Sequence, residues 1–174
     1  MNIALVAHDG RKKELIEWVT YNYEKLSKHN IYATGTTGKL IKEIEIRTPA
    51  STEAKPLEGT DVYIVPMVHM TKIETPFADN VTCLLSGPLG GDQEIGSMIA
   101  EGKIDMLIFF CDNLIMQGHQ NDVSALTRLA SLYNIAFATN RTTADMLLTS
   151  SLFDNKDYVR IIPKAIEDYK NRKL

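Results

Sequence analysis

The chain alternates short apolar runs, rich in β-branched residues, with helix-length amphipathic stretches, and this alternation constrains its fold more than any other feature. The apolar runs are residues 3–7, 31–33, 81–85, 106–110 and 135–138. The apolar spacing elsewhere predicts helices over residues 12–26, 38–44, 92–101, 123–133 and 143–150. Because strands buried on both faces have continuous apolar runs, the pattern predicts an α/β fold with helices on both faces of a mostly parallel, five-stranded sheet. A later apolar run, 158–162, and a polar helix toward Arg172 follow.

Residues 46–80 interrupt this alternation, because they are too many for a helix-to-strand connection in a compact domain. Residues 48–61 are turn-like, whereas 43–47 and 62–70 have the alternating apolar spacing of two strands. We therefore expect a β-hairpin arm inserted into a single domain of residues 1–174. Lid, subunit-interface and inert-arm roles are all compatible with it, and the unpartnered apolar residues of a hairpin favour an interface.

Charge and hydropathy exclude several classes of partner. The net charge is −3 and the pI is about 5.8, so no overall positive field attracts nucleic acid or an anionic membrane. No apolar stretch approaches the length that spans a bilayer, and the first residues lead directly into a strand rather than a signal peptide. Cys83 and Cys111 have no paired spacing. These features predict a soluble, cytoplasmic protein that binds neither nucleic acid nor membrane.

A threonine- and glycine-rich segment, residues 34–38, follows the second predicted strand and opens a helix. Unpaired N–H groups and the positive dipole end of a helix N-terminus favour an anion, so this segment predicts a phosphate cradle. A plain turn with a threonine cap is the alternative. The spacing matches neither a Walker loop nor a dinucleotide fingerprint. Six residues are candidates to contact the phosphate: Thr34, Thr36, Thr37, Ser86, Gly87 and Lys12.

Acid–base side chains follow the other predicted strands, at the edge where open parallel sheets bind ligands. Asp92 follows two glycines, which allow close approach to a small ligand, and suits a general base; a helix N-cap is the structural alternative. His119 lies among polar neighbours, and its imidazole suits proton transfer near neutral pH. The other candidates are His8, Asp9, Asp112 and Asp122. No metal-ligand spacing occurs among these residues, so we expect no metal.

These pieces, in this order, resemble the methylglyoxal synthase family. The matching segments are I-A-L-V-A-H-D at 3–9, Y-A-T-G-T-T-G at 32–38, L-S-G-P-L-G-G-D-Q at 85–93, E-G-K-I-D at 101–105, A-T-N at 138–140 and T-A-D at 143–145. They cover almost the whole chain outside residues 46–80. Related domains that only bind regulatory ligands typically lack the acidic S-G-P-x-G-G-D-Q motif.

The resemblance implies a Rossmann-like, three-layer domain that assembles as a homohexamer. It also implies conversion of dihydroxyacetone phosphate, a small phosphorylated substrate, to methylglyoxal and inorganic phosphate without metal or organic cofactor. The family's base corresponds to Asp92 and its proton-handling histidine to His119, with Asp9, Asp112 and Asp122 as supporting carboxylates and His8 beside the substrate. Phosphate contacts correspond to Lys12, Thr34, Thr36, Thr37, Ser86 and Gly87, and a tail arginine that reaches a neighbouring subunit's phosphate site corresponds to Arg172.

The chain departs from the family pattern in two places. The loop around His119 lacks the usual prolines, which raises the entropy that must be lost to hold the histidine. Residues 46–80 have no counterpart in the usual pattern. Two other functions remain open for this fold: a non-catalytic module that binds a phosphate ligand as a signal, and an isomerase of phosphorylated sugars, for which 46–80 is the available lid.

Overall fold

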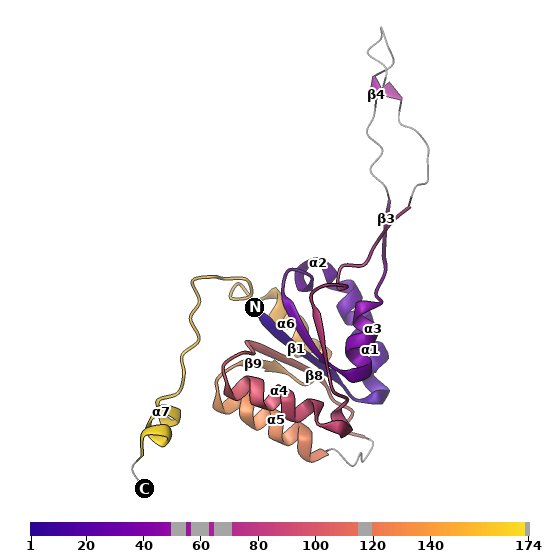
Figure 1. The fold of residues 1–174 in the computed structure, drawn as a ribbon. Helices are drawn as coiled ribbons and strands as arrows, with labels where there is room; N and C mark the ends of the chain where they lie inside the picture. Colours follow the sequence, from indigo (N-terminus) through magenta and orange to yellow (C-terminus); the bar gives the residue numbers. More distant parts are fainter. Residues whose placement is uncertain (50–54, 57–62, 65–70, 115–119, 173–174) are drawn as a thin grey trace.

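The protein is built on a parallel sheet of five strands in the order β7-β2-β1-β8-β9 (Figure 1). The strands are β1 (Asn2–Ala7), β2 (Asn30–Thr34), β7 (Val81–Leu84), β8 (Met106–Phe110) and β9 (Ala136–Ala138). This computed structural model describes residues 1–49, 55–56, 63–64, 71–114 and 120–172. All four strand pairings are parallel, so the carboxyl ends of the strands meet at one edge. The predicted α/β class with a mostly parallel sheet is confirmed.

Helices cover both faces of this sheet and make three layers (Figure 1). On one face lie α1 (Lys12–Tyr21), α2 (Tyr23–Leu26), α3 (Gly35–Lys42) and α6 (Arg141–Thr149); on the other lie α4 (Gly91–Ala100) and α5 (Gln120–Leu132). Successive side chains of a strand point to opposite faces. In β1, Ile3 and Leu5 therefore join the core cluster that contains Trp18. Ala4 and Val6 join the other cluster, which contains Ile95 and Ile99.

Two predicted helices have different limits in the structure. The helix predicted over 12–26 is divided at Asn22, whose side-chain amide donates to the Trp18 carbonyl at 2.9 Å, so α1 ends and the short α2 follows. The helix predicted from residue 38 begins at Gly35. The threonine-glycine segment is therefore the first turn of α3 itself, with Thr34 at the N-cap position and without a side-chain capping bond.

The insertion forms the predicted antiparallel hairpin, and its described strands have other limits than those predicted. Strand β3 (Ile46–Pro49) pairs with β6 (Thr71–Glu74), and further along the arm β4 (Lys55–Pro56) pairs with β5 (Tyr63–Ile64). Strand β3 overlaps the first predicted strand, 43–47, and β5 lies within the second, 62–70, of which residues 62 and 65–70 lie outside the described residues. At the base of the arm, the strand that pairs with β3 is β6, which follows 62–70. Residues 75–80 belong to the body, since Phe77 is fully buried in the core.

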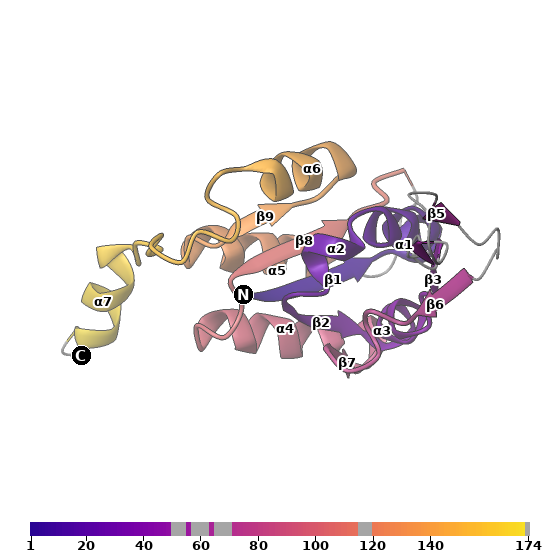
Figure 2. The ribbon, with the colours of Figure 1, turned by 90° about the horizontal axis from the view of Figure 1, so that it is seen from above.

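The hairpin and the C-terminal helix both extend away from the sheet. Helix α3 begins at the carboxyl edge of the sheet and runs back to the amino edge, where β7 starts. The hairpin connects the end of α3 to β7, so it leaves from the amino edge (Figures 1 and 2). The apolar run 158–162 forms no strand, and α7 (Lys164–Asn171) stands apart from the body in both views. Among the described residues, no helix has the length and apolar character needed to cross a membrane.

Candidate active site

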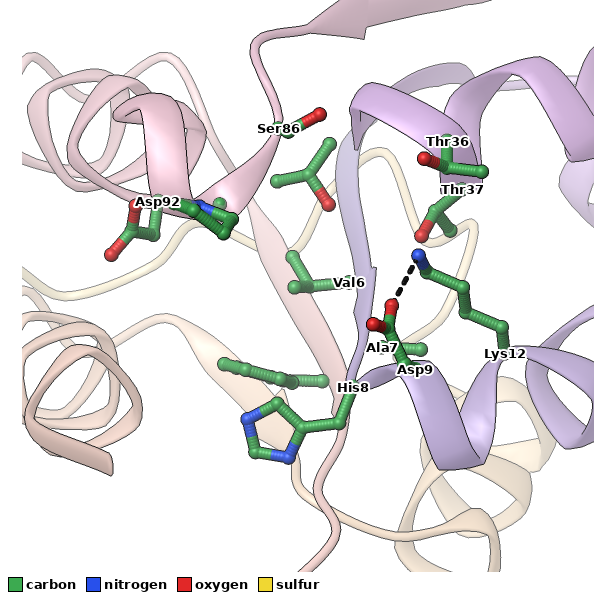
Figure 3. Close-up of a pocket in the computed structure, with 13 residues that line it drawn as sticks. Val6, Ala7, His8, Asp9, Lys12, Thr36, Thr37, Ser86 and Asp92 are labelled. Atoms are coloured by element: carbon green, nitrogen blue, oxygen red, sulfur yellow. Dashed lines mark hydrogen bonds and ion pairs between the residues drawn. The ribbon is translucent and has the colours of Figure 1, made fainter. Parts of the chain in front are cut away.

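A cavity of about 420 Å³ opens at the carboxyl edge of the sheet, where β1, β2, β7 and β8 end. Most of the residues predicted for the site line it: His8, Asp9, Lys12, Thr34, Thr36, Thr37, Ser86, Gly87 and Asp92. In Figure 3, Asp92 lies on the α4 side of the cavity, whereas Thr36, Thr37 and Lys12 lie on the opposite side. The topology of the parallel sheet thus brings segments from four separate parts of the sequence to one place.

The loop after β7 is packed directly against the first turn of α3. The Gly35 N–H donates to the Leu85 carbonyl at 3.1 Å, and a Cβ on Gly35 would lie 2.3 Å from Ser86 Oγ. Only glycine allows this approach, because any side chain would collide with Ser86. The Ser86 hydroxyl and the N-terminus of α3 therefore face the same small volume.

The α3 side of the cavity has the properties of an anion site. The first N–H groups of a helix have no partner within the helix, and here they coincide with the positive end of its dipole. The Thr37 side chain is almost fully buried, and its hydroxyl has no hydrogen-bond partner among the described residues. Figure 3 shows Lys12 pointing toward Thr37. The Thr37 hydroxyl, the Lys12 ammonium group and the N-terminus of α3 thus lie together on one side of the cavity.

Lys12 also bonds to Asp9 within the cavity. Its Nζ lies 2.6 Å from Asp9 Oδ1, and the hydrogen bond and charge of the lysine hold the pKa of Asp9 below its usual value. Asp9 is therefore a carboxylate at neutral pH. Because the Asp9 side chain is largely exposed, its role in this structure is to orient the lysine rather than to contribute much stability.

Asp92 is held in the second position of α4 by a tightly packed glycine turn. Gly90 is the N-cap, with φ of +105°, so the N-cap alternative for Asp92 is wrong. A Cβ on Gly91 would lie 1.9 Å from the Leu85 carbonyl oxygen, which shows how closely this turn meets the β7 loop. The Asp92 side chain is only 6% exposed and accepts a hydrogen bond from Gln93 Nε2 at 2.9 Å. A buried carboxylate thus lines the cavity that contains the anion site.

His8 is fixed in one tautomer by a backbone group. The Asp112 N–H donates to His8 Nδ1 at 2.8 Å, so the neutral ring has its proton on Nε2. The ring packs edge-on against Phe109, with centroids 5.0 Å apart. His8 Nε2 is buried and makes no hydrogen bond to any described residue. It is therefore a donor that a bound molecule at this position can satisfy.

Among the described side chains, those of Asp112 and Arg172 are predicted site residues that do not line the cavity. Asp112 acts through its backbone N–H, and its carboxylate Oδ1 accepts from Leu114 N–H at 3.2 Å. Arg172 follows α7, away from the cavity, and its guanidinium lies over the Tyr169 ring at 3.9 Å. His119 lies outside the described residues, and Asp122 is in α5 without a described side chain.

The structure adds lining residues that the sequence reasoning missed, chiefly Phe109 and Pro88. Both could have been found in the sequence, because Pro88 stands within the S-G-P-x-G-G-D-Q segment and Phe109 within a predicted strand. Phe109 and Phe110 are consecutive residues at the end of a buried strand, so their side chains point to opposite faces of the sheet. One of the two must therefore face the side of the sheet that α4 covers. Within the described ranges, no group of three or more histidine, cysteine, aspartate or glutamate side chains is arranged to hold a metal ion.

Comparisons with known proteins agree with this geometry. Residues 14–139 match the model of the MGS-like domain. The methylglyoxal synthases of Yersinia enterocolitica and Proteus mirabilis are 45% and 46% identical to the chain over 160 residues, which cover 92% of this chain and 84% of each relative. The crystal structure of methylglyoxal synthase from Elizabethkingia anophelis superposes with a TM-score of 0.73 at 38% identity, covering 99% of this chain and 91% of that one. The chain belongs to the methylglyoxal synthase family.

Proposed function

We propose that the protein is a lyase that converts dihydroxyacetone phosphate to methylglyoxal and inorganic phosphate through an enediolate intermediate. The observation that carries this proposal is the placement of a buried carboxylate, Asp92, in the same small cavity as the anion-binding turn of α3. One group can take a carbon-bound proton while the other holds the phosphate. The relatives' shared name and the S-G-P-x-G-G-D-Q segment support the same reaction.

The first step is binding of the substrate phosphate by the α3 turn. Thr34, Thr36 and Thr37 supply hydroxyl and backbone donors, and Ser86 and Gly87 approach from the β7 loop. Lys12 adds the positive charge. Holding the phosphate here sets the torsion about the bridging C–O bond, which decides the product.

The second step is proton abstraction from the hydroxymethyl carbon by Asp92. The electrons of the C–H bond form the enediolate, and the ketone oxygen gains negative charge. His8 can donate to that oxygen from Nε2, since Asp112 N–H holds the other ring nitrogen as an acceptor. We assign proton transfer between the substrate oxygens to His119, with Asp122 as a supporting carboxylate, on the family resemblance.

The third step is loss of phosphate. When the bridging C–O bond stands perpendicular to the enediolate plane, its antibonding orbital accepts the electron pair, the C–O bond breaks and inorganic phosphate leaves. The remaining enol aldehyde gains a proton on carbon and becomes methylglyoxal. The same enediolate with the C–O bond in the plane would be reprotonated to an isomer, so the phosphate position selects elimination.

The direct test is to incubate the purified protein with dihydroxyacetone phosphate and to follow methylglyoxal and phosphate. We expect the two to appear in equal amounts. Glyceraldehyde 3-phosphate without phosphate release would instead show an isomerase. Phosphate-ligand binding without any product would show a regulatory module of the same fold.

A first prediction concerns the phosphate cradle. Replacing Thr37 with alanine should weaken both substrate binding and inhibition by inorganic phosphate by about tenfold, because the lost hydroxyl is buried and bonds to a charged ligand. Thr36→Ala should weaken both in the same direction. The measurements are KM and the phosphate inhibition constant, with thermal unfolding as the control for folding. Unchanged inhibition by phosphate in both variants would contradict the assignment of the cradle.

We further propose that the protein acts in the cytoplasm as a homohexamer in which Arg172 reaches a neighbouring subunit's phosphate site. The family resemblance supports this assembly, and the position of α7, apart from its own sheet, is compatible with contact to another subunit (Figure 1). The hairpin is a second candidate contact. It leaves from the edge opposite the cavity, and none of its described residues lines that cavity.

A second prediction separates the arm from a lid. The loop must be shortened between Arg47 and Ile73, which face each other in the β3–β6 pairing, because a longer deletion would remove the core residue Phe77. Replacing residues 48–72 with Asn-Gly, which favours a tight hairpin turn, should change oligomer size or thermal stability but alter kcat per folded subunit by less than about threefold. Light scattering and steady-state kinetics measure the two effects. Lost turnover in a fully assembled variant would favour the lid.

A further inference from the structure

A second cavity, of about 510 Å³, lies at the amino edge of the sheet, opposite the candidate active site. Met106 and Ala136, the first residues of β8 and β9, form its floor. Leu147 of α6 and the segment that follows this helix form its walls. None of the described residues lines both cavities.

The segment 156–162 closes one side of this cavity as an ordered strap. Its residues alternate: Tyr158, Arg160 and Ile162 line the cavity, while Val159 and Ile161 between them are 79% and 77% exposed. Two hydrogen bonds tie the strap to the body. Asn134 Nδ2 donates to the Ile161 carbonyl at 2.9 Å, and the Arg160 guanidinium donates to the Ile104 carbonyl at 3.1 Å. The alternation thus places Arg160 against the cavity, whereas Tyr158 and Ile162 line it while remaining 53% and 42% exposed.

The cavity is mostly apolar, and three of its lining residues carry a charge: Arg160, Asp105 and the N-terminal residue Met1, whose ammonium group lies 3.3 Å from His29 Nδ1. Apolar and aromatic groups make up most of its surface, including Met106, Leu147, Leu152 and Phe153. Of the polar lining groups, Asp105 already accepts the Asn2 N–H at 2.8 Å. Arg160 has one hydrogen bond for its five N–H groups, and none of the ion pairs among the described residues includes it.

We propose that this cavity binds a small amphipathic carboxylate, with a hydrocarbon body against the apolar walls and a carboxylate paired with Arg160. Guanidinium and carboxylate match in plane and spacing, so their pairing is strong and directional. The volume falls within the range of about 300–1,000 Å³ typical of small-molecule sites, and apolar walls with a few placed polar groups are their usual composition.

The test is thermal unfolding of the full-length protein with octanoate, with 1-octanol as the neutral analogue of the same chain length. All samples contain saturating inorganic phosphate, which occupies the anion site of the first cavity. At about ten times its dissociation constant, octanoate should raise the unfolding midpoint by about 3 °C, whereas octanol at the same concentration should raise it by less than half as much. Equal shifts for the two compounds, or no shift for octanoate, would overturn the proposal without requiring any variant.

Two variants and a matched control locate the binding. Arg160→Gln, whose amide can still donate to the Ile104 carbonyl, should weaken octanoate binding at least tenfold, and Leu147→Trp should abolish it by filling the cavity. Arg128→Gln removes the same charge from the exposed surface of α5 and should leave binding unchanged. Octanoate affinity that survives both cavity variants would place the ligand elsewhere and refute the assignment. Because octanoate binding is followed by thermal unfolding and not by turnover, the outcome does not depend on the proposed enzymatic reaction.

Discussion

Replacing Asp92 with asparagine is expected to reduce kcat by about 10³-fold while leaving inorganic phosphate binding nearly unchanged. The amide keeps the size of the side chain and can still accept from Gln93 Nε2, but it is not basic enough to take a proton from carbon. The phosphate contacts lie on α3, on the opposite side of the cavity (Figure 3). Steady-state kinetics and phosphate titration measure the two quantities independently.

Glu94→Gln is the matched control for Asp92→Asn. Glu94 lies in the same first turn of α4, carries the same charge and accepts the Leu85 N–H at 2.9 Å, which glutamine can also do. A loss of charge near the helix N-terminus therefore occurs in both variants, whereas only one removes the proposed base. A decrease in kcat that is as large for Glu94→Gln as for Asp92→Asn would show an effect of helix charge. Near-normal turnover of Asp92→Asn would exclude Asp92 as the base.

Substituting Gly91 with alanine should lower kcat/KM by at least about 10²-fold and also lower the unfolding midpoint. The added methyl group would lie 1.9 Å from the Leu85 carbonyl oxygen. The backbone fixes the position of a Cβ atom, and the oxygen is itself a backbone atom, so neither can rotate away. The turn must open, and Asp92 moves relative to the phosphate cradle. Displacement of a catalytic group by about 1 Å is enough to cause a loss of this size.

The control for Gly91→Ala is Gly96→Ala in the same helix. The new methyl group there would meet the flexible end of the Leu129 side chain at 3.1 Å, which can shift by a few tenths of an ångström. Alanine also has the higher helix propensity, so stability should change little and activity should stay near normal. Normal activity of Gly91→Ala would show that the close approach of the β7 loop is not required for catalysis.

That the candidate site residues lie together was predictable from the sequence because the rule involved is simple. Parallel strands end at one edge, so residues that follow different strands, such as His8, Thr36 and Asp92, are brought together whatever the details of packing. Their chemistry follows from the residue types alone. The cavity contains all three, although their catalytic roles remain predictions.

Other features could not be predicted because they depend on contacts between distant residues. The Asp112 N–H that orients His8 lies 104 residues away in the sequence, and the aspartate suggested a role for its carboxylate rather than its backbone. The start of α3 at Gly35 depends on the contact with Ser86, which a local pattern does not contain. The hairpin register was likewise not predictable, since alternating polarity identifies strands but does not determine which residues face each other.

The sequence by itself determined the layers of the fold, the edge where the site lies and the chemical groups available there. Periodicity and residue type are local properties, so no tertiary contact is needed to detect them. Only the tertiary structure decided the tautomer of His8, the tight approach of Gly91 to Leu85 and the second cavity beside Arg160. Each of these depends on distances of a few ångströms between separate segments, and such distances follow from how whole helices and strands pack against one another.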